Sequence, residues 1–197
     1  MLMAERAVPP RVALAERAAT EMGFTKSCLP DVGRLLRLTA TAKPGGVIAE
    51  SGTGSGVGTA WLHSGLGAGA RLVTVEREEE LARRASGIFA DDDRVSVLTG
   101  DWRLLERHAP FDVFFCDGGG KRDAPGQVVE LLAPGGVLVL DDFTPSPHWP
   151  PRFEGEVDEL RLFYLTHPDL DATEVLTTPT TSAVVAARRP GRVEVTV

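Results

Sequence analysis

The segment that decides the fold is Val47-Ile48-Ala49-Glu50-Ser51-Gly52-Thr53-Gly54-Ser55-Gly56-Val57-Gly58. A short apolar run ends in the carboxylate Glu50, a glycine-rich turn follows at once, and helical spacing resumes over residues 59–63. A strand, a glycine turn and a helix in this order are typical of the nucleotide-binding corner of a doubly wound α/β sheet. Glycines let the backbone approach a ligand closely, and the helix N-terminus offers free N–H groups to a negative group. The segment therefore predicts a ligand site where the first strand ends.

The glycine spacing narrows the class of ligand. A dinucleotide fingerprint needs Gly-x-Gly-x-x-Gly/Ala, but the third position is Val57, Thr59 or Trp61 in the three available registers. A phosphate-binding P-loop needs lysine and then serine or threonine after its last glycine, and neither is present here. The spacing Glu-x-Gly-x-Gly-x-Gly, from Glu50 to Gly56, resembles the first motif of the class I S-adenosylmethionine-dependent methyltransferases. A glycine-rich turn without a ligand is the alternative.

Composition and charge indicate one soluble globular domain. The 197 residues are 43% hydrophobic and 25% charged, and no low-complexity linker divides them. The formal net charge is −7 without a dense run of lysine or arginine, which disfavours nucleic acid as a partner. Neither a membrane-spanning segment nor a signal-peptide pattern is visible, so we expect a cytoplasmic protein without a membrane partner. Of the two cysteines, Cys116 lies in an apolar run and is more typical of a small core residue than of a disulfide partner.

Residues 1–45 are expected to form a helical cover on a Rossmann-like core of residues 46–190. Apolar spacing predicts a helix over 11–22 and a second one that begins at Pro30. The linker between them, residues 24–29, has two interpretations. The methyltransferase resemblance implies that it lines the methionine end of the cofactor, whereas on its composition it is a simple connector.

Two further apolar runs end near candidate cofactor ligands. Residues 71–76 end in Glu76, and an acidic residue at this position of a doubly wound sheet can accept hydrogen bonds from both ribose hydroxyls. Arg77 follows directly and could flank the adenosine. Residues 95–98 precede Gly100, Asp101 and Trp102, which by resemblance form an adenine pocket. Asp101 could instead cap a helix over 102–108.

The second half of the chain predicts the rest of the sheet. Residues 111–117 and 137–142 are read as the fourth and fifth strands, and Pro134-Gly135-Gly136 before the fifth strand resembles the same enzymes. Helices are predicted over 127–132 and from 153 or 154 to 166. Two final strands, 173–177 and 182–187, are joined by so short a link that it permits a hairpin but no parallel crossover. We therefore predict an α/β fold with a doubly wound, seven-stranded, mostly parallel sheet, an antiparallel last strand and helices on both faces.

Three carboxylates follow the fourth and fifth strands. The resemblance implies that Asp117, Asp141 and Asp142 match, position by position, the metal ligands of metal-dependent small-molecule O-methyltransferases. Mg²⁺ prefers such oxygen ligands and can orient an acceptor hydroxyl. Catechol-type members usually have Asn at the position of Asp142, whereas some sugar O-methyltransferases carry Asp-Asp, so this departure bears on the substrate more than on the metal. In the alternative interpretation the carboxylates face solvent or cap a turn.

Two residues are candidates for the general base. Catechol-type enzymes have a lysine where this chain has Gly120, and Lys121 is one residue later. His148 lies in an aromatic, proline-rich loop after the fifth strand, where the acceptor is expected to dock. A surface lysine and a loop histidine are the alternative interpretations. Trp149 and Phe153 could form an apolar wall of the acceptor pocket or simply pack the loop.

These observations predict a single-domain class I methyltransferase that binds S-adenosylmethionine and transfers a methyl group to a hydroxyl of a small-molecule acceptor. The rivals are a metal-independent N- or O-methyltransferase of the same fold and a non-catalytic S-adenosylmethionine-binding protein. An NAD-linked oxidoreductase is disfavoured by the glycine spacing and the terminal hairpin. Family resemblance makes a homodimer plausible, while the acceptor and the conformation of residues 191–197 are left open. The residues assigned to the cofactor are Glu50, Gly52, Thr53, Gly54, Gly56, Gly58, Glu76, Arg77, Gly100, Asp101, Trp102 and Asp117.

Overall fold

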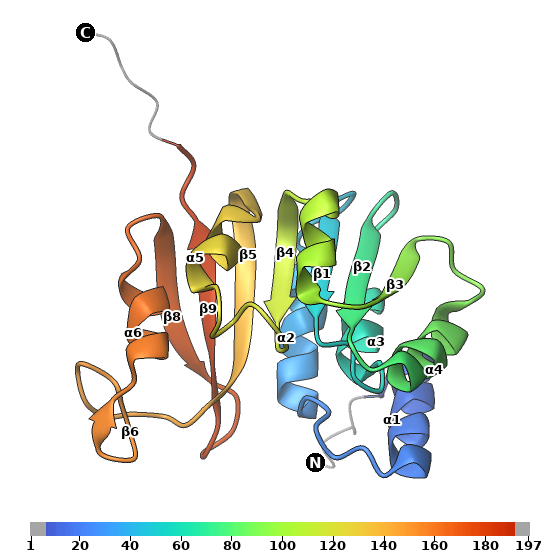
Figure 1. Cartoon of the computed structure of the whole chain (residues 1–197), viewed down its shortest axis with the longest axis horizontal. Helices are drawn as coiled ribbons and strands as arrows, with labels where there is room; N and C mark the ends of the chain where they lie inside the picture. The colour runs from blue at the N-terminus through green and yellow to red at the C-terminus, as the bar shows by residue number, and fades with distance from the viewer. Residues whose placement is uncertain (1–6, 192–197) are drawn as a thin grey trace, which may run out of the picture.

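The computed structural model of the chain describes residues 7–191, and seven of its strands form one mixed sheet (Figure 1). The strand order is β3-β2-β1-β4-β5-β9-β8. Neighbouring strands from β3 to β5 pair in parallel, whereas β9 pairs antiparallel with both β5 and β8. This confirms the predicted sheet with its antiparallel last strand. The strands are β1 (Val47–Ser51), β2 (Arg71–Glu76), β3 (Val95–Thr99), β4 (Phe111–Cys116), β5 (Leu132–Phe143), β8 (Leu170–Leu176) and β9 (Ser182–Arg188).

Helices cover both faces of the sheet because its strands are apolar on both sides. In β4, Val113 and Phe115 pack into one core cluster with the first four helices, while Phe114 and Cys116 pack into the other. This alternation follows from the two-residue period of a strand and accounts for the unbroken apolar run in the sequence. One face carries α1 (Pro10–Met22), α2 (Pro30–Thr41), α3 (Val57–His63) and α4 (Glu79–Phe89), and the other carries η1 (Trp102–His108), α5 (Pro125–Glu130) and α6 (Glu159–Thr166).

The helix predicted from residue 153 or 154 begins later than expected. Residues 152–157 instead form a small hairpin of β6 (Arg152–Phe153) and β7 (Glu156–Val157). Its turn places Glu154 at φ 51° and Gly155 at φ 89°, two left-handed conformations that a helix does not contain. The prediction was wrong because the apolar spacing of α6 continues backwards into residues that adopt a tight turn.

Two smaller differences between the predicted and observed helices lie close to β4 in the sequence. The segment over 102–108 is a 3-10 helix, and the helix predicted over 127–132 spans Pro125–Glu130. Leu132 already pairs with Phe111, so β5 begins before the Pro-Gly-Gly segment and the register shifts there. Long-range pairing with β4 therefore ends the helix earlier than its apolar residues suggested.

The carboxyl ends of the five parallel strands lie at one edge of the sheet. Figure 1 shows the α1–α2 linker and β6 at the same lower end of the molecule to which β4 and β2 point. Loops at this edge are where an open α/β sheet binds its ligands. Within residues 7–191, no helix combines the length and apolarity needed to cross a bilayer.

Packing between α2 and α3 depends on Gly33. A methyl group at this position would overlap the indole of Trp61, which is 3% exposed. Gly33→Ala is therefore expected to lower the free energy of unfolding by about 1–3 kcal/mol, the usual range for overpacking a core. Urea denaturation followed by circular dichroism measures this change.

Gly87 provides the matched control because it also lies in a helix, α4, but has no atom within 4 Å of the position that an added methyl group would take. Gly87→Ala should raise the free energy of unfolding by roughly 0.5–1 kcal/mol through helix propensity alone. Equal effects of the two substitutions would contradict the contact between Gly33 and Trp61.

Candidate functional site

The site lies at the glycine turn after β1, where two cavities adjoin. Both cavities are lined by Gly52 and Glu76, so the two together form one trough that crosses the turn. The first continues under the α1–α2 linker and the second continues toward η1. The remaining lining residues of the first are Phe24, Lys26, Ser27, Cys28, Glu50, Thr53, Gly54, Ser55, Val57, Gly58, Phe115 and Asp117, and those of the second are Val75, Arg77, Glu78, Gly100, Asp101, Trp102, Gly118 and Gly119.

The glycine turn requires glycine for two separate reasons. Gly52, Gly54 and Gly56 have φ values of 91°, 53° and 89°, in the left-handed region that side chains disfavour. A methyl group on Gly52 would also lie 2.9 Å from the backbone nitrogen of Gly118, because the loops after β1 and β4 touch. The Gly118 N–H donates to the carbonyl of Ser51 at 2.6 Å. The turn and the loop after β4 are thus held as one backbone surface under the trough.

Glu50 is buried beneath the first cavity with one carboxylate oxygen left free. Its Oε2 accepts hydrogen bonds from the hydroxyls of Thr59 and Thr74, the latter at 2.6 Å. Its Oε1 has no hydrogen-bond partner among the described residues, although the side chain is 1% exposed. Gly58 lies against this oxygen, where any side chain would collide with it. Burial raises the pKa of Glu50 to about 8, against the lowering effect of the two hydroxyls.

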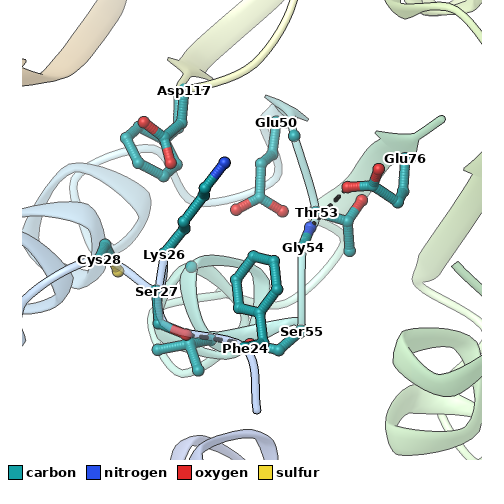
Figure 2. Close-up of a pocket in the computed structure, with 14 residues that line it drawn as sticks. Phe24, Lys26, Ser27, Cys28, Glu50, Thr53, Gly54, Ser55, Glu76 and Asp117 are labelled. Atoms are coloured by element: carbon teal, nitrogen blue, oxygen red, sulfur yellow. Dashed lines mark hydrogen bonds between the residues drawn. The ribbon is translucent and has the colours of Figure 1, made fainter. Parts of the chain in front are cut away.

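Asp117 presents a second free carboxylate oxygen to the same cavity. Its Oδ1 is buried and has no partner among the described residues. Burial is the largest cause that raises the pKa of Asp117 to about 7, and the negative charge of Asp142 adds to it. Buried carboxylate oxygens are normally hydrogen-bonded, so the two free oxygens mark the place of a missing donor. Figure 2 shows both carboxylates facing the same space.

Glu76 lies where the two cavities meet. Its Oε2 accepts a hydrogen bond from the Gly54 N–H at 2.8 Å, and its Oε1 accepts one from the Glu78 N–H at 3.0 Å. Two backbone donors therefore orient the carboxylate, and its side chain is still partly exposed to the trough. This is the position that a ribose diol would need.

The second cavity contains the residues predicted for adenine. Asp101 is exposed and also caps η1, since its side chain accepts from the Arg103 N–H at 3.0 Å. Trp102 is 5% exposed and packs against Gly119, and its indole N–H donates to Asp123 at 3.2 Å. Both interpretations of Asp101 are thus compatible with the geometry. Most of the Trp102 ring, however, is covered, so it forms a floor of the cavity more than an open stacking face.

The α1–α2 linker lines the first cavity, and its contact with the methionine end of a cofactor stays a prediction. The ring of Phe24 covers Gly54, and the hydroxyls of Ser27 and Ser55 lie 3.1 Å apart. Cys28 also lines the cavity, and burial together with the nearby carboxylates raises the pKa of its thiol. Lys26 points its amino group into the same space (Figure 2). Sequence reasoning missed Lys26 as an individual residue, because a lone lysine in a loop carries no local signal.

The three carboxylates predicted to bind a metal are not arranged as a metal site. Among residues 7–191, no group of three or more His, Cys, Asp or Glu side chains is placed to hold a metal ion. Asp141 is 5% exposed within β5, whereas Asp142 is exposed and has φ 65°. The donor set thus does not fit a preformed cation site in this conformation, and the metal stays a prediction.

The two candidate bases differ in their surroundings. Lys121 is 5% exposed, so it is not the surface lysine of the alternative interpretation. Its ammonium donates to the backbone carbonyl of Asp141 and lies 4.9 Å from the ring centroid of Phe143. His148 is exposed in the loop after β5, and its backbone N–H donates to Ser146 Oγ at 3.3 Å. Neither side chain lines the two cavities of the trough.

The polar groups along the trough suit an elongated nucleoside ligand. One end offers a cation two carboxylate oxygens that have no partner among the described residues. The middle offers an oriented carboxylate to a diol, and the far end offers Asp101 and a covered indole to a base. These features match the parts of S-adenosylmethionine in order: methionine ammonium, ribose and adenine. The residues present therefore fit this cofactor.

Comparisons with known proteins agree with this geometry. Residues 18–141 match the family model described as Protein-L-isoaspartate(D-aspartate) O-methyltransferase (PCMT). A proposed O-methyltransferase of Mycobacterium avium (strain 104) is 37% identical over 139 residues, which cover 66% of this chain and 62% of that protein. The chain thus spans less than two thirds of the length of this relative.

Solved structures show the same fold. The O-methyltransferase from Bacillus cereus in complex with S-adenosylhomocysteine has a TM-score of 0.76 at 23% identity, and the match covers 94% of each chain. The O-methyltransferase TomG from Streptomyces achromogenes, solved with S-adenosylmethionine, has a TM-score of 0.73 at 23% identity over 93% of this chain and 91% of that one. Because the family model matches well over half of the sequence, the protein belongs to the protein-L-isoaspartate(D-aspartate) O-methyltransferase (PCMT) family of class I S-adenosylmethionine-dependent methyltransferases.

Proposed function

We propose that this protein binds S-adenosylmethionine in the trough and transfers its methyl group to an oxygen of a small-molecule acceptor. The observation that carries the proposal is the union of the two cavities at Gly52 and Glu76, with the free oxygens of Glu50 and Asp117 at one end. The names of the Mycobacterium avium relative and of the two solved structures support oxygen as the methylated atom.

The chain contributes binding and alignment to this reaction. When bound, S-adenosylmethionine supplies a methyl group activated by a sulfonium, and the transfer is an in-line displacement. Glu50 and Asp117 would accept hydrogen bonds from the ammonium, and Glu76 would accept them from the ribose. The glycine turn lets the backbone approach the ligand closely. Holding both reactants in register accounts for a large part of the rate, because proximity converts a bimolecular step into a unimolecular one.

The acceptor is expected beyond the ends of β4 and β5. Trp149 lies in the loop after β5 and Phe153 in β6, and they are 69% and 50% exposed. Exposed aromatic side chains suit a flat or apolar acceptor better than a highly charged one. Lys121 and His148 stay the candidate bases. Cation dependence is a separate question, since the proposal needs no metal to place the cofactor.

Methyl transfer from labelled S-adenosylmethionine tests the proposal. We expect transfer to members of a panel of phenolic and sugar hydroxyl compounds, measured as labelled product by mass spectrometry. An isoaspartyl peptide belongs in the same panel because the family model carries that substrate in its name. Transfer to the peptide alone would replace the small-molecule acceptor, and transfer to an amine alone would contradict an oxygen acceptor.

The same assay tests whether methyl transfer depends on a divalent cation. Activity lost with EDTA and restored by Mg²⁺ would support the predicted cation, and Asp141→Asn should then abolish the restoration. Activity unchanged by EDTA would favour the metal-independent enzyme. Binding of S-adenosylhomocysteine without any methyl transfer to the panel would favour the non-catalytic binding protein.

A further inference from the structure

Lys26 is the cation in an otherwise acidic cavity. Among the described residues that line the first cavity, Glu50, Glu76 and Asp117 carry acidic groups and Lys26 carries the basic one. Figure 2 shows its amino group directed between Asp117 and Glu50. Within the described part of the chain, no carboxylate lies within 4.0 Å of this ammonium, so it forms no ion pair there.

The linker does not depend on Lys26 for its position. Phe24 packs over Gly54, and Ser27 Oγ lies 3.1 Å from Ser55 Oγ. Phe24 and Ser27 flank Lys26 closely in the chain and attach the linker to the glycine turn. The lysine side chain is exposed and forms neither a hydrogen bond nor a salt bridge of its own among residues 7–191. Its direction into the cavity is therefore available for a ligand.

The methionine end of the proposed cofactor carries two opposite charges. Its ammonium matches the free oxygens of Glu50 and Asp117, but its carboxylate would enter a cavity that holds three acidic side chains. Like charges at such short range repel each other, and water is partly displaced from the cavity by the ligand. A positive group is needed near the carboxylate, and Lys26 is placed to supply it.

We propose that Lys26 binds the carboxylate of the methionine moiety and makes the site select for cofactors that carry it. This inference rests on the proposed cofactor site. It assigns to the linker a charge-recognition role that the glycine motif does not provide. Because Lys26 touches the cofactor far from the adenine, its effect should depend on one chemical group of the ligand and on no other.

Titrating wild-type and Lys26→Met protein with two ligands, one with and one without the carboxylate, isolates the effect of this group. S-adenosylhomocysteine has both the ammonium and the carboxylate, whereas its decarboxylated analogue, S-adenosyl-3-thiopropylamine, keeps only the ammonium. Lys26→Met should weaken binding of S-adenosylhomocysteine about tenfold, as expected for one partly exposed charge-assisted hydrogen bond. Binding of the amine analogue should change by less than about twofold. Isothermal titration calorimetry measures all four affinities.

Arg17→Met is the control for net charge. Arg17 is exposed on α1 and does not line the cavity. Its substitution by methionine removes one positive charge, as Lys26→Met does. Its variant should bind both ligands like the wild type. Lys26→Arg should keep most of the preference for the carboxylate.

The outcomes separate the inference from the proposed function. Equal weakening of both ligands by Lys26→Met, or no weakening of either, would overturn the role of Lys26 while the cofactor site stands. A change confined to the KM of the acceptor would also overturn it and place Lys26 in the acceptor site. Wild-type protein that binds neither ligand would instead refute the proposed function.

Discussion

Glu76→Ala is expected to weaken binding of S-adenosylhomocysteine by at least about 100-fold. Glu76 lies where the two cavities meet, and the N–H groups of Gly54 and Glu78 orient its two oxygens. A carboxylate held in this way can accept from both ribose hydroxyls. Each charge-assisted hydrogen bond contributes about 1.5–3 kcal/mol, and each 1.4 kcal/mol corresponds to a factor of ten in affinity. Removing the side chain also frees the Gly54 N–H in the middle of the turn.

Calorimetric titration of the wild-type and Glu76→Ala proteins with S-adenosylhomocysteine checks this prediction. Glu79→Ala is the matched control, because its side chain is exposed in the first turn of α4 and lines neither cavity. That variant should bind within about twofold of the wild type, since an exposed charge contributes little. Circular dichroism should show both variants folded. A Glu76→Ala protein that binds as tightly as Glu79→Ala would remove Glu76 from the ribose site.

The stability of the ligand-free protein is expected to fall between about pH 5 and pH 8 because of Glu50. Burial raises the pKa of this carboxyl from 4.5 to about 8. The native state therefore keeps a proton that the unfolded state releases. When the native state binds more protons, the free energy of unfolding decreases as the pH rises. The stability due to Glu50 is present in full below its unfolded pKa and is lost as the pH rises through its folded pKa.

Glu50→Gln isolates this contribution from those of other groups. Glutamine resembles the protonated carboxyl in shape and charge and does not titrate. The stability of the variant relative to the wild type should increase by a few kcal/mol from pH 5 to pH 8, because one pKa unit corresponds to about 1.4 kcal/mol. Urea titrations at several pH values measure the difference. Glu21→Gln, at an exposed position of α1, should show no such trend.

Cofactor binding should depend on pH in the opposite direction. The ammonium of the ligand favours the ionised form of Glu50, so wild-type affinity for S-adenosylhomocysteine should increase from pH 6 to pH 8. Glu50→Gln should lose the part of this increase that is due to Glu50, and the part due to Asp117 should remain. A wild-type stability profile parallel to that of Glu50→Gln would show that Glu50 is already ionised in the ligand-free protein.

Local sequence patterns predicted the elements that surround the site with few errors. The apolar runs that end in Glu50 and Glu76 are strands whose carboxyl ends meet at one edge. The short link before residue 182 forms the predicted hairpin of β8 and β9. The helix expected from residue 153 or 154 to 166 is present as α6, but its predicted start was wrong because Glu154 takes a left-handed conformation, which its residue type does not signal.

Charged residues inside the fold were harder to predict. Arg161 is fully buried, with ion pairs to Asp158 and Glu174 at 2.9 Å each. It also donates to the carbonyl of Thr144, which ties α6 to the loop after β5. Lys121 is buried in a similar way. In the sequence both are ordinary polar positions, because apart from Asp158 the partners that make their burial tolerable come from other segments.

The sequence by itself determined the order of strands and helices, the glycine turn and the acidic residues at the strand ends, since these depend on short periodic patterns and on the backbone freedom of glycine. Tertiary structure alone decided that Lys26 reaches the cavity of Glu50 and Asp117 and that Trp102 lies under Gly119. Such distances join residues far apart in the chain. They are set by how helices pack on the sheet and by which turn conformations the loops adopt, and no local pattern encodes them.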